Sequence, residues 1–182
     1  MSLIGTPFGQ VPVLEVDGVQ LAQSQAISRY LARRHGLAGK DDMEQAFADM
    51  HVDHIKDMMI AGRHSYTEKD PEKQKEYNAK YLTDVLGPTI KKLEETLAKN
   101  GSGCLIGSDV SHPILSLQWI VNWIVGLTGL QITWADLAYY NFFTYSMDKM
   151  ADLMKDAPLL KALIERIGNN PNIKKYKAPP AQ

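Results

Sequence analysis

TPFGQVPVLEVDGVQLAQS, residues 6–24, is the stretch that decides the N-terminal fold. Two short apolar-rich runs, 11–16 and 19–22, flank an Asp17-Gly18 pair, which is typical of a hairpin turn. Pro12 has no backbone N–H to donate to a ladder, so it must lie at a sheet edge or at an irregular point. The stretch therefore predicts a β-hairpin whose first strand carries backbone groups without ladder partners.

A helix should follow the hairpin directly. Apolar residues recur with helical spacing over 25–35, Ser24 is a candidate N-cap, and Gly36 suits the position just past the C-terminal end. Arg29 and Arg33 are expected to face outward. A hairpin and one helix bury too little surface to fold alone, so this unit needs further partner surface.

After a linker over 36–41, the chain is expected to be almost entirely helical. Apolar stripes at helical spacing predict helices over 42–65 and 72–99, and the first stripe contains Phe47, Met50, His54, Ile55, Met58 and Met59. Further helices should begin at Thr133 and cover 159–167. Together these elements predict a fold between α+β and mostly α.

Three local features refine this helical half. Pro88 removes one backbone hydrogen bond and should bend the helix that contains it. Thr133 and Asp136 have the spacing of a capping box at the start of a helix. The Pro- and Lys-rich tail from Asn169 is expected to be coil.

The composition excludes several classes of function. The 182 residues are 45% hydrophobic and 23% charged, as in ordinary globular proteins. A net charge of −1 gives no general attraction for nucleic acid or an anionic membrane. Cys104 is the only cysteine, so an internal disulfide and a cysteine-rich zinc site are both impossible. With no secretory signal in residues 1–10, we expect a cytoplasmic protein.

One segment departs from the helical pattern. Residues 110–135 contain no Asp, Glu, Lys or Arg, and 113–130 are mostly apolar. The length of this apolar run nearly meets the requirement for a membrane span. Gln118 and Asn122 interrupt it, so we expect no membrane association.

The first candidate site combines Gln10, Val11 and Pro12 with Gln23 and Ser24. An irregular strand can pair with the backbone of an extended, peptide-like ligand. A helix N-terminus beside it favours a carboxylate, because its N–H groups and dipole attract negative charge. These residues therefore suit a small anionic peptide, and the alternative is a plain hairpin with an ordinary helix cap.

A second candidate is the group His51, Asp53, His54 and Asp57. Two histidines at i and i+3 can bind one metal ion, but a third ligand is missing from any obvious motif. The alternative is a helix surface that faces another helix or solvent, and we favour it. Cys104 has no His or cationic neighbour in sequence, so we expect a buried apolar role and not a nucleophile.

The same residues carry a family resemblance. Residues 6–18 and 21–31, together with MEQA at 43–46, TWAD at 133–136 and NPNIKKY at 170–176, resemble the glutathione transferases, and most closely their sigma class and its invertebrate relatives. This resemblance covers about 5–109 and 132–177. It implies a thioredoxin-like N-terminal domain, here 1–36, followed by an all-helical C-terminal domain over 37–182.

The resemblance also implies site residues. The Val11–Pro12 peptide bond would be cis, and the Val11 backbone would pair with the cysteinyl unit of glutathione. Gln10 would contact the glycyl end. Gln23 and Ser24 would hold the γ-glutamyl carboxylate and amine. Asp57 lies where the family places an acidic residue of the second subunit against that amine, which implies a homodimer.

Two departures from the family pattern shape the expectations. In the family, a strand, a helix and a second strand precede the motif of residues 6–18, and this region carries the thiol-activating tyrosine. The region has no counterpart here, so the chain resembles a truncated member without a catalytic residue. Deleting 110–131 joins GSD to ITWAD, a good family sequence. Codons for Val110 begin with GT and one codon for Gln131 ends with AG, so we expect an unspliced intron.

The function expected from the resemblance is conjugation of the glutathione thiol to small hydrophobic electrophiles, in detoxification. Glutathione would be a co-substrate, with no further cofactor. Lys56 interrupts the acidic cluster that binds a divalent cation in the prostaglandin D synthase branch, so we expect no metal. The alternative is a non-catalytic relative that binds ligands or has a structural role, because the activating tyrosine is missing.

Overall fold

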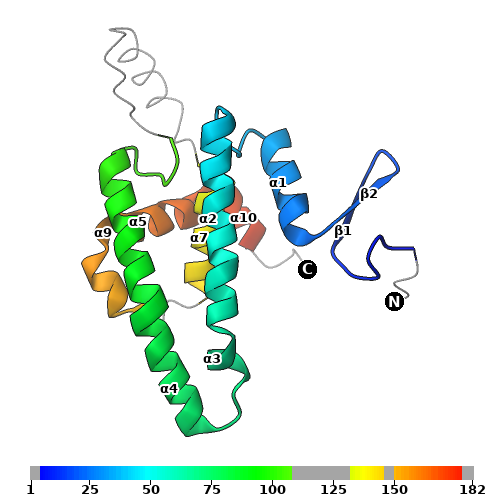
Figure 1. Ribbon diagram of the computed structural model, residues 1–182. Coiled ribbons are helices and arrows are strands. Elements are labelled where there is room, and N and C mark those ends of the chain that lie inside the picture. The colour runs from blue at the N-terminus through cyan, green and yellow to red at the C-terminus, as the bar shows by residue number, and fades with distance from the viewer. Residues whose placement is uncertain (1–4, 108–131, 146–149, 178–182) are drawn as a thin grey trace, which may run out of the picture.

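The computed structural model describes residues 5–107, 132–145 and 150–177, which form a small sheet and a helical body (Figure 1). The N-terminal part consists of β1 (Val13–Val16), β2 (Val19–Ala22) and α1 (Ser24–Arg34). The elements that follow are α2 (Asp42–Ala61), α3 (Arg63–Thr67), α4 (Pro71–Tyr81), the π-helical segment η1 (Leu82–Leu86), α5 (Gly87–Asn100), α7 (Trp134–Thr144), the 3-10 segment η2 (Leu153–Asp156), α9 (Pro158–Asn169) and α10 (Pro171–Lys177). The expected fold class is confirmed.

The hairpin forms as the sequence predicts. β1 and β2 are antiparallel, with Val13 opposite Ala22 and Val16 opposite Val19. Asp17 and Gly18 have φ of 50° and 78°, and two positive φ angles characterise the turn that joins twisted strands in a two-residue loop. The regular strand begins at Val13 and not at residue 11, because Pro12 precedes it.

Helix α1 ends where the sequence predicts. The N–H of Leu37 donates to the carbonyl of Ala32 at 2.8 Å, and the N–H of Gly36 donates to that of Arg33 at 3.5 Å. This is the hydrogen-bond pattern of a Schellman motif, and Gly36 adopts the φ of 70° that the motif requires.

An ion-paired contact docks α1 against α2. Nε of Arg29 lies 2.8 Å from a carboxylate oxygen of Asp49, and its Nη2 lies 3.6 Å from Asp53. The Arg29 guanidinium also lies 5.5 Å from the centre of the Trp134 ring. The expectation that Arg29 faces outward is therefore wrong, because the polar face of α1 meets acidic residues of a neighbouring helix. Arg33 joins Asp49 at 3.7 Å from a more exposed position.

The two long predicted helices are each interrupted. The 42–65 segment divides at Gly62 into α2 and α3, and the 72–99 segment contains the π-helical turn η1 between α4 and α5. Pro88 comes just after this π-helical turn, within a run that is helical on both sides, and it cannot donate a backbone hydrogen bond there. The wider π-helical turn before it is a common way for a helix to pass an irregular point.

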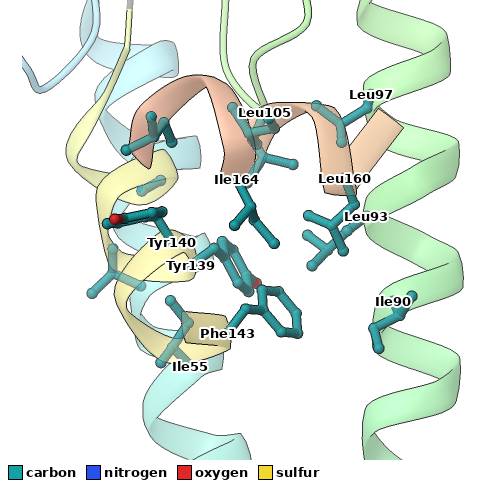
Figure 2. Packing of buried hydrophobic residues seen from close by; sticks show 14 of the residues in the cluster. Ile55, Ile90, Leu93, Leu97, Leu105, Tyr139, Tyr140, Phe143, Leu160 and Ile164 are labelled. Atoms are coloured by element: carbon teal, nitrogen blue, oxygen red, sulfur yellow. The ribbon is translucent and has the colours of Figure 1, made fainter. Parts of the chain in front are cut away.

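The core lies where α2, α5, α7 and α9 meet. Figure 2 shows aromatic and aliphatic side chains from these helices converging on one apolar centre. Tyr139 and Phe143 are 1% and 0% exposed, and their rings stack with centroids 5.9 Å apart. Leu93 and Leu97 of α5 and Leu160 and Ile164 of α9 close the other side.

Asp136 joins this core to the loop after α5. Thr133 and Asp136 form the expected capping box. The Asp136 carboxylate also accepts a hydrogen bond at 2.8 Å from the N–H of Leu105, which lies 31 residues earlier in the chain. Burial raises the pKa of Asp136, and the bonds from Leu105 and Thr133 oppose that rise.

Two expectations about the helical half are wrong. The tail forms helix α10 up to Lys177, because Pro171 is well placed at a helix start. The apolar stripe predicted over 42–65 is only partly buried, because its members Phe47, Met50 and Met59 are 47%, 54% and 61% exposed. The buried face of α2 contains Ile55 and Met58 of that stripe, together with Ala48 and Val52. The apolar stripe was wide enough to include both faces, which periodicity alone does not separate.

Within 5–107, 132–145 and 150–177, no helix is long and apolar enough to cross a membrane. The expected insert at 110–131 and the apolar run 113–130 inside it lie outside the described residues.

Candidate functional site

The two ends of the hairpin bring the first candidate residues together. Because Val13 is opposite Ala22, the segment before β1 and the segment after β2 leave the sheet at the same end. Gln10, Val11 and Pro12 are all exposed there, and the Val11–Pro12 peptide bond is cis, as the resemblance implies. In the part of the chain that the structure describes, the outer edge of β1 has no strand partner. This edge can pair with an extended ligand backbone.

Helix α1 begins at the same place with an unusual residue. Gln23 has φ 73° and ψ 114°, a left-handed conformation that non-glycine residues rarely adopt. The expectation that Ser24 is the N-cap is wrong: Ser24 is the first residue of the helix, and Gln23 occupies the cap position without a side-chain hydrogen bond. Strained backbone of this kind is concentrated at binding sites, so it marks this junction as a candidate.

The first turn of α1 is open to an anion. The first hydrogen bond of the helix runs from the N–H of Ile27 to the carbonyl of Gln23, at 2.9 Å. The amides of Ser24, Gln25 and Ala26 therefore have no acceptor within the helix. No side chain caps them, and the first turn contains no acidic residue. A carboxylate is the ligand group that such a helix end favours.

Asp57 lies apart from this junction. It is exposed on α2, whereas the hairpin packs against α1, which lies between the two in Figure 1. Asp57 shares one face of α2 with Met43, Phe47, Met50 and His54, at spacings of three and four residues. Met43, Phe47 and Met50 on this face are between 47% and 61% exposed. Exposed apolar side chains that gather on one helix face are a feature of protein–protein interfaces.

The two histidines lie beside a tyrosine hydroxyl, whereas a metal site would need a third ligand beside them. His51 and His54 both lie against the Tyr139 hydroxyl of α7, which supports the interpretation that they face another helix. Sequence reasoning missed Tyr139 as their partner, because nothing in the sequence links positions more than 80 residues apart. Among the described residues, no group of three His, Cys, Asp or Glu side chains is arranged to bind a metal ion.

Three buried side chains that could in principle act as nucleophiles or acids have raised pKa values. Cys104 is 2% exposed, as expected, and burial raises the pKa of its thiol to about 11. Burial likewise raises the pKa of Tyr81 to about 12 and the pKa of Tyr139 still further. These three groups are therefore protonated at neutral pH and are not suited to act as nucleophiles or bases there.

Comparisons with known proteins identify relatives over most of the chain. Residues 5–33 match the glutathione S-transferase N-terminal domain, and residues 122–180 match the glutathione S-transferase C-terminal domain. Glutathione S-transferase 1 of Ascaris suum is 37% identical over 183 residues, which cover 95% of this chain and 75% of that protein. Hematopoietic prostaglandin D synthase of Gallus gallus is 37% identical over 168 residues, covering 92% and 71% respectively. A solved glutathione S-transferase structure of Caenorhabditis elegans superposes with a TM-score of 0.74 at 31% identity, covering 97% of this chain and 78% of that one.

Proposed function

The chain belongs to the glutathione S-transferase family, and we propose that it binds glutathione at the junction of the hairpin with α1. The observation that carries this proposal is the uncapped first turn of α1 beside the strained Gln23. Glutathione is an extended anionic peptide, so it matches both the open strand edge and the helix end. At the level of the family, the reaction is conjugation of the glutathione thiol.

Each part of glutathione has a proposed partner. The cysteinyl unit pairs with the backbone of Val11, and Gln10 contacts the glycyl end. The γ-glutamyl carboxylate lies at the start of α1, where the Gln23 and Ser24 side chains and the free first-turn amides can donate to it. This assignment is supported by the register that places both segments at one end of the hairpin.

The second subunit completes the site in this proposal. Asp57 is separated from the hairpin within one chain, so it would reach the γ-glutamyl amine of a partner's glutathione. The exposed face of α2 that carries Asp57 also carries Phe47 and Met50, which suit a homodimer interface. A charge-assisted hydrogen bond to the ligand amine would then depend on dimer formation.

The second candidate function is glutathione binding without catalysis, and it depends on whether a tyrosine can activate the glutathione thiol. Tyr81 and Tyr139 have raised pKa values, the opposite of what a group that stabilises a thiolate requires. We propose that neither of these two tyrosines activates the thiol and that the chain is a non-catalytic relative. The chain would then bind glutathione and hydrophobic electrophiles without rapid conjugation. A turnover assay with glutathione and a reactive aryl halide separates the two functions, because activity within about tenfold of a catalytically active family member excludes the binding-only role.

We also propose that the chain belongs to the sigma class, is cytoplasmic, acts in detoxification and carries 110–131 as an insert in the family fold. The residues that flank this segment support the last point. The N–H of Leu105 bonds to Asp136, so the chain on either side of the segment is already joined. A connection from Gly107 through residues 108–109 to Ile132 is therefore compatible with the fold.

Calorimetry with glutathione tests the site. Ser24→Ala removes a proposed hydroxyl donor and should weaken binding about fivefold to tenfold, the loss of roughly 1 kcal/mol. Ser28→Ala is the matched control, because Ser28 is exposed one turn further along the same helix. Equal effects of the two substitutions would remove Ser24 from the site.

A heterodimer made by mixing two variants tests whether residues of two subunits share one site. A heterodimer of one Ser24→Ala and one Asp57→Asn subunit should contain one intact site and one doubly impaired site. Two equivalent, moderately weakened sites would show that Asp57 acts within its own subunit or not at all.

A further inference from the structure

Two histidines of α2 converge on one buried tyrosine of α7. Nδ1 of His51 lies 3.5 Å from the Tyr139 hydroxyl, and Nδ1 of His54 lies 3.2 Å from the same oxygen. The Tyr139 side chain is only 1% exposed, and the His51 ring meets its ring edge-on with centroids 5.8 Å apart. This cluster is separate from the junction of the hairpin with α1, although His54 shares a face of α2 with Asp57.

The number of protons in the cluster is limited by its hydrogen bonds. A hydroxyl has one hydrogen to donate, and it accepts through its lone pairs. With both imidazoles neutral, the hydroxyl donates to one Nδ1 and accepts from the N–H of the other. With one imidazole protonated, its N–H donates to the hydroxyl and the hydroxyl donates to the other Nδ1, so both hydrogen bonds can form, but a charge on His51 is held in a partly buried site. If both imidazoles were protonated, both would donate, and the Tyr139 hydrogen would have no acceptor within the cluster. Two positive charges on successive turns would also repel each other.

We propose that His51, His54 and Tyr139 form a proton-sensitive latch that holds α2 against α7. The latch is closed when both imidazoles are neutral and weakens when the histidine pair takes up protons. Since α2 also carries the acidic residues that bind Arg29, opening the latch loosens the surface on which α1 is docked.

The charged groups around the cluster form no ion pair with its two histidines. Asp49 and Asp53, on the same helix, are paired with Arg29 of α1. The other elements packed on α2 bring His64 from α3 and Asp84 from η1. Among the described residues, no carboxylate forms an ion pair with His51 or His54. Asp57 lies one turn from His54 on the same face of α2, but it is exposed and forms no ion pair with either histidine, so solvent screens its effect on their protonation.

The direction of the pH effect follows from burial. Desolvation, with a smaller contribution from His54, lowers the pKa of His51 below its ordinary value of 6.5. The unfolded chain therefore takes up this proton at a higher pH than the folded chain. The free energy of unfolding should fall as the pH drops through 6.5 towards the lower folded value, and should then level off with respect to this group.

Titration of the imidazoles by NMR tests the latch in the unmodified chain. We expect His51 to titrate below 6.5 and its protonation to shift the resonances of both His54 and Tyr139. Titration of His51 at or above 6.5, or independent titration of the two histidines, would overturn the proposal.

Thermal unfolding of variants at about pH 7.5 and about pH 5.5 is the second test. Tyr139→Phe removes only the hydroxyl, so it should lower the midpoint more at the higher pH, where the latch is closed. His51→Gln should reduce the fall in midpoint between the two pH values. His35→Gln, at the exposed end of α1, is the matched control and should leave that fall unchanged. An equal loss at both pH values for Tyr139→Phe would identify the cluster as ordinary packing. If that variant does not fold, the NMR titration still decides.

Discussion

At the scale of single residues, Asp136 connects two segments that are distant in the sequence. Its capping role could be predicted from the TWAD spacing alone, because a capping box is a local pattern. Its bond to the N–H of Leu105 could not be predicted, because it depends on how the loop after α5 returns to the core. One fully buried carboxylate thus joins the start of α7 to a segment 31 residues away.

Replacing Asp136 with Asn should destabilise the chain by about 2–3 kcal/mol. The amide can no longer accept from both Leu105 and Thr133, and its own N–H₂ group would face buried donors. Urea denaturation measures the loss. Asp156→Asn is the control, because Asp156 is exposed. The free energy of unfolding of this variant should be unchanged. Equal stability of the two variants would contradict the role given to Asp136.

Gly62 is a second position of this kind, because a single added carbon atom would clash with a neighbouring ring. A Cβ there would lie 2.7 Å from Cζ of the Tyr81 ring, although the backbone φ of −79° suits any residue. Gly62→Ala should therefore cost about 1–3 kcal/mol through overpacking alone. Tyr81→Leu, which removes the ring, should relieve most of that cost in a double-mutant cycle. A cost that persists without the ring would instead point to the helix junction itself.

At the scale of elements, the docking of α1 on α2 shows where sequence reasoning stops. The boundaries of α1 follow from local signals, namely the hairpin before it and Gly36 after it. Which face of α1 meets a neighbour is a tertiary property, so Arg29 was assigned to solvent. The same limit applied to α2, where periodicity could not separate the buried face with Ile55 from the exposed face with Phe47.

Arg29→Met should weaken the attachment of α1. The substitution removes the ion pairs with Asp49 and Asp53 and the contact with the Trp134 ring, while it keeps an apolar stem. Because the groups are partly exposed, we expect a loss of about 1 kcal/mol that shrinks in high salt. Arg34→Met is the control, because Arg34 is exposed and bonds only to the Tyr30 hydroxyl in the described part of the chain. A loss that does not depend on salt would exclude the ion pairs as its cause.

At the scale of the whole molecule, the order of hairpin, helix and helical body was predictable, because each unit carries its own periodicity and turn residues. The assembly of the candidate site was predictable in part. Gln10, Val11, Pro12, Gln23 and Ser24 lie together because hairpin register fixes them locally. The left-handed Gln23 and the position of Asp57 depend on tertiary packing and, for Asp57, on the proposed partner subunit.

Deleting 110–131 should raise the thermal midpoint and the soluble yield. The deletion removes a long uncharged stretch and joins two flanks that Asp136 already links. Uncharged apolar sequence promotes aggregation wherever it is exposed, which gives the expected direction. Melting curves of the two chains decide the matter, and a lower midpoint after deletion would show that the segment contributes to the native core.

The central claim is that glutathione binds where the hairpin meets α1, and mapping of amide NMR shifts during a glutathione titration tests it most directly. We predict saturable shifts at Val11, Val13 and Gln23 and at the first-turn amides 24–26, all weakened by Ser24→Ala and unaffected by Ser28→Ala. The absence of saturable shifts at these amides, or larger shifts on another face of the molecule, would contradict the claim.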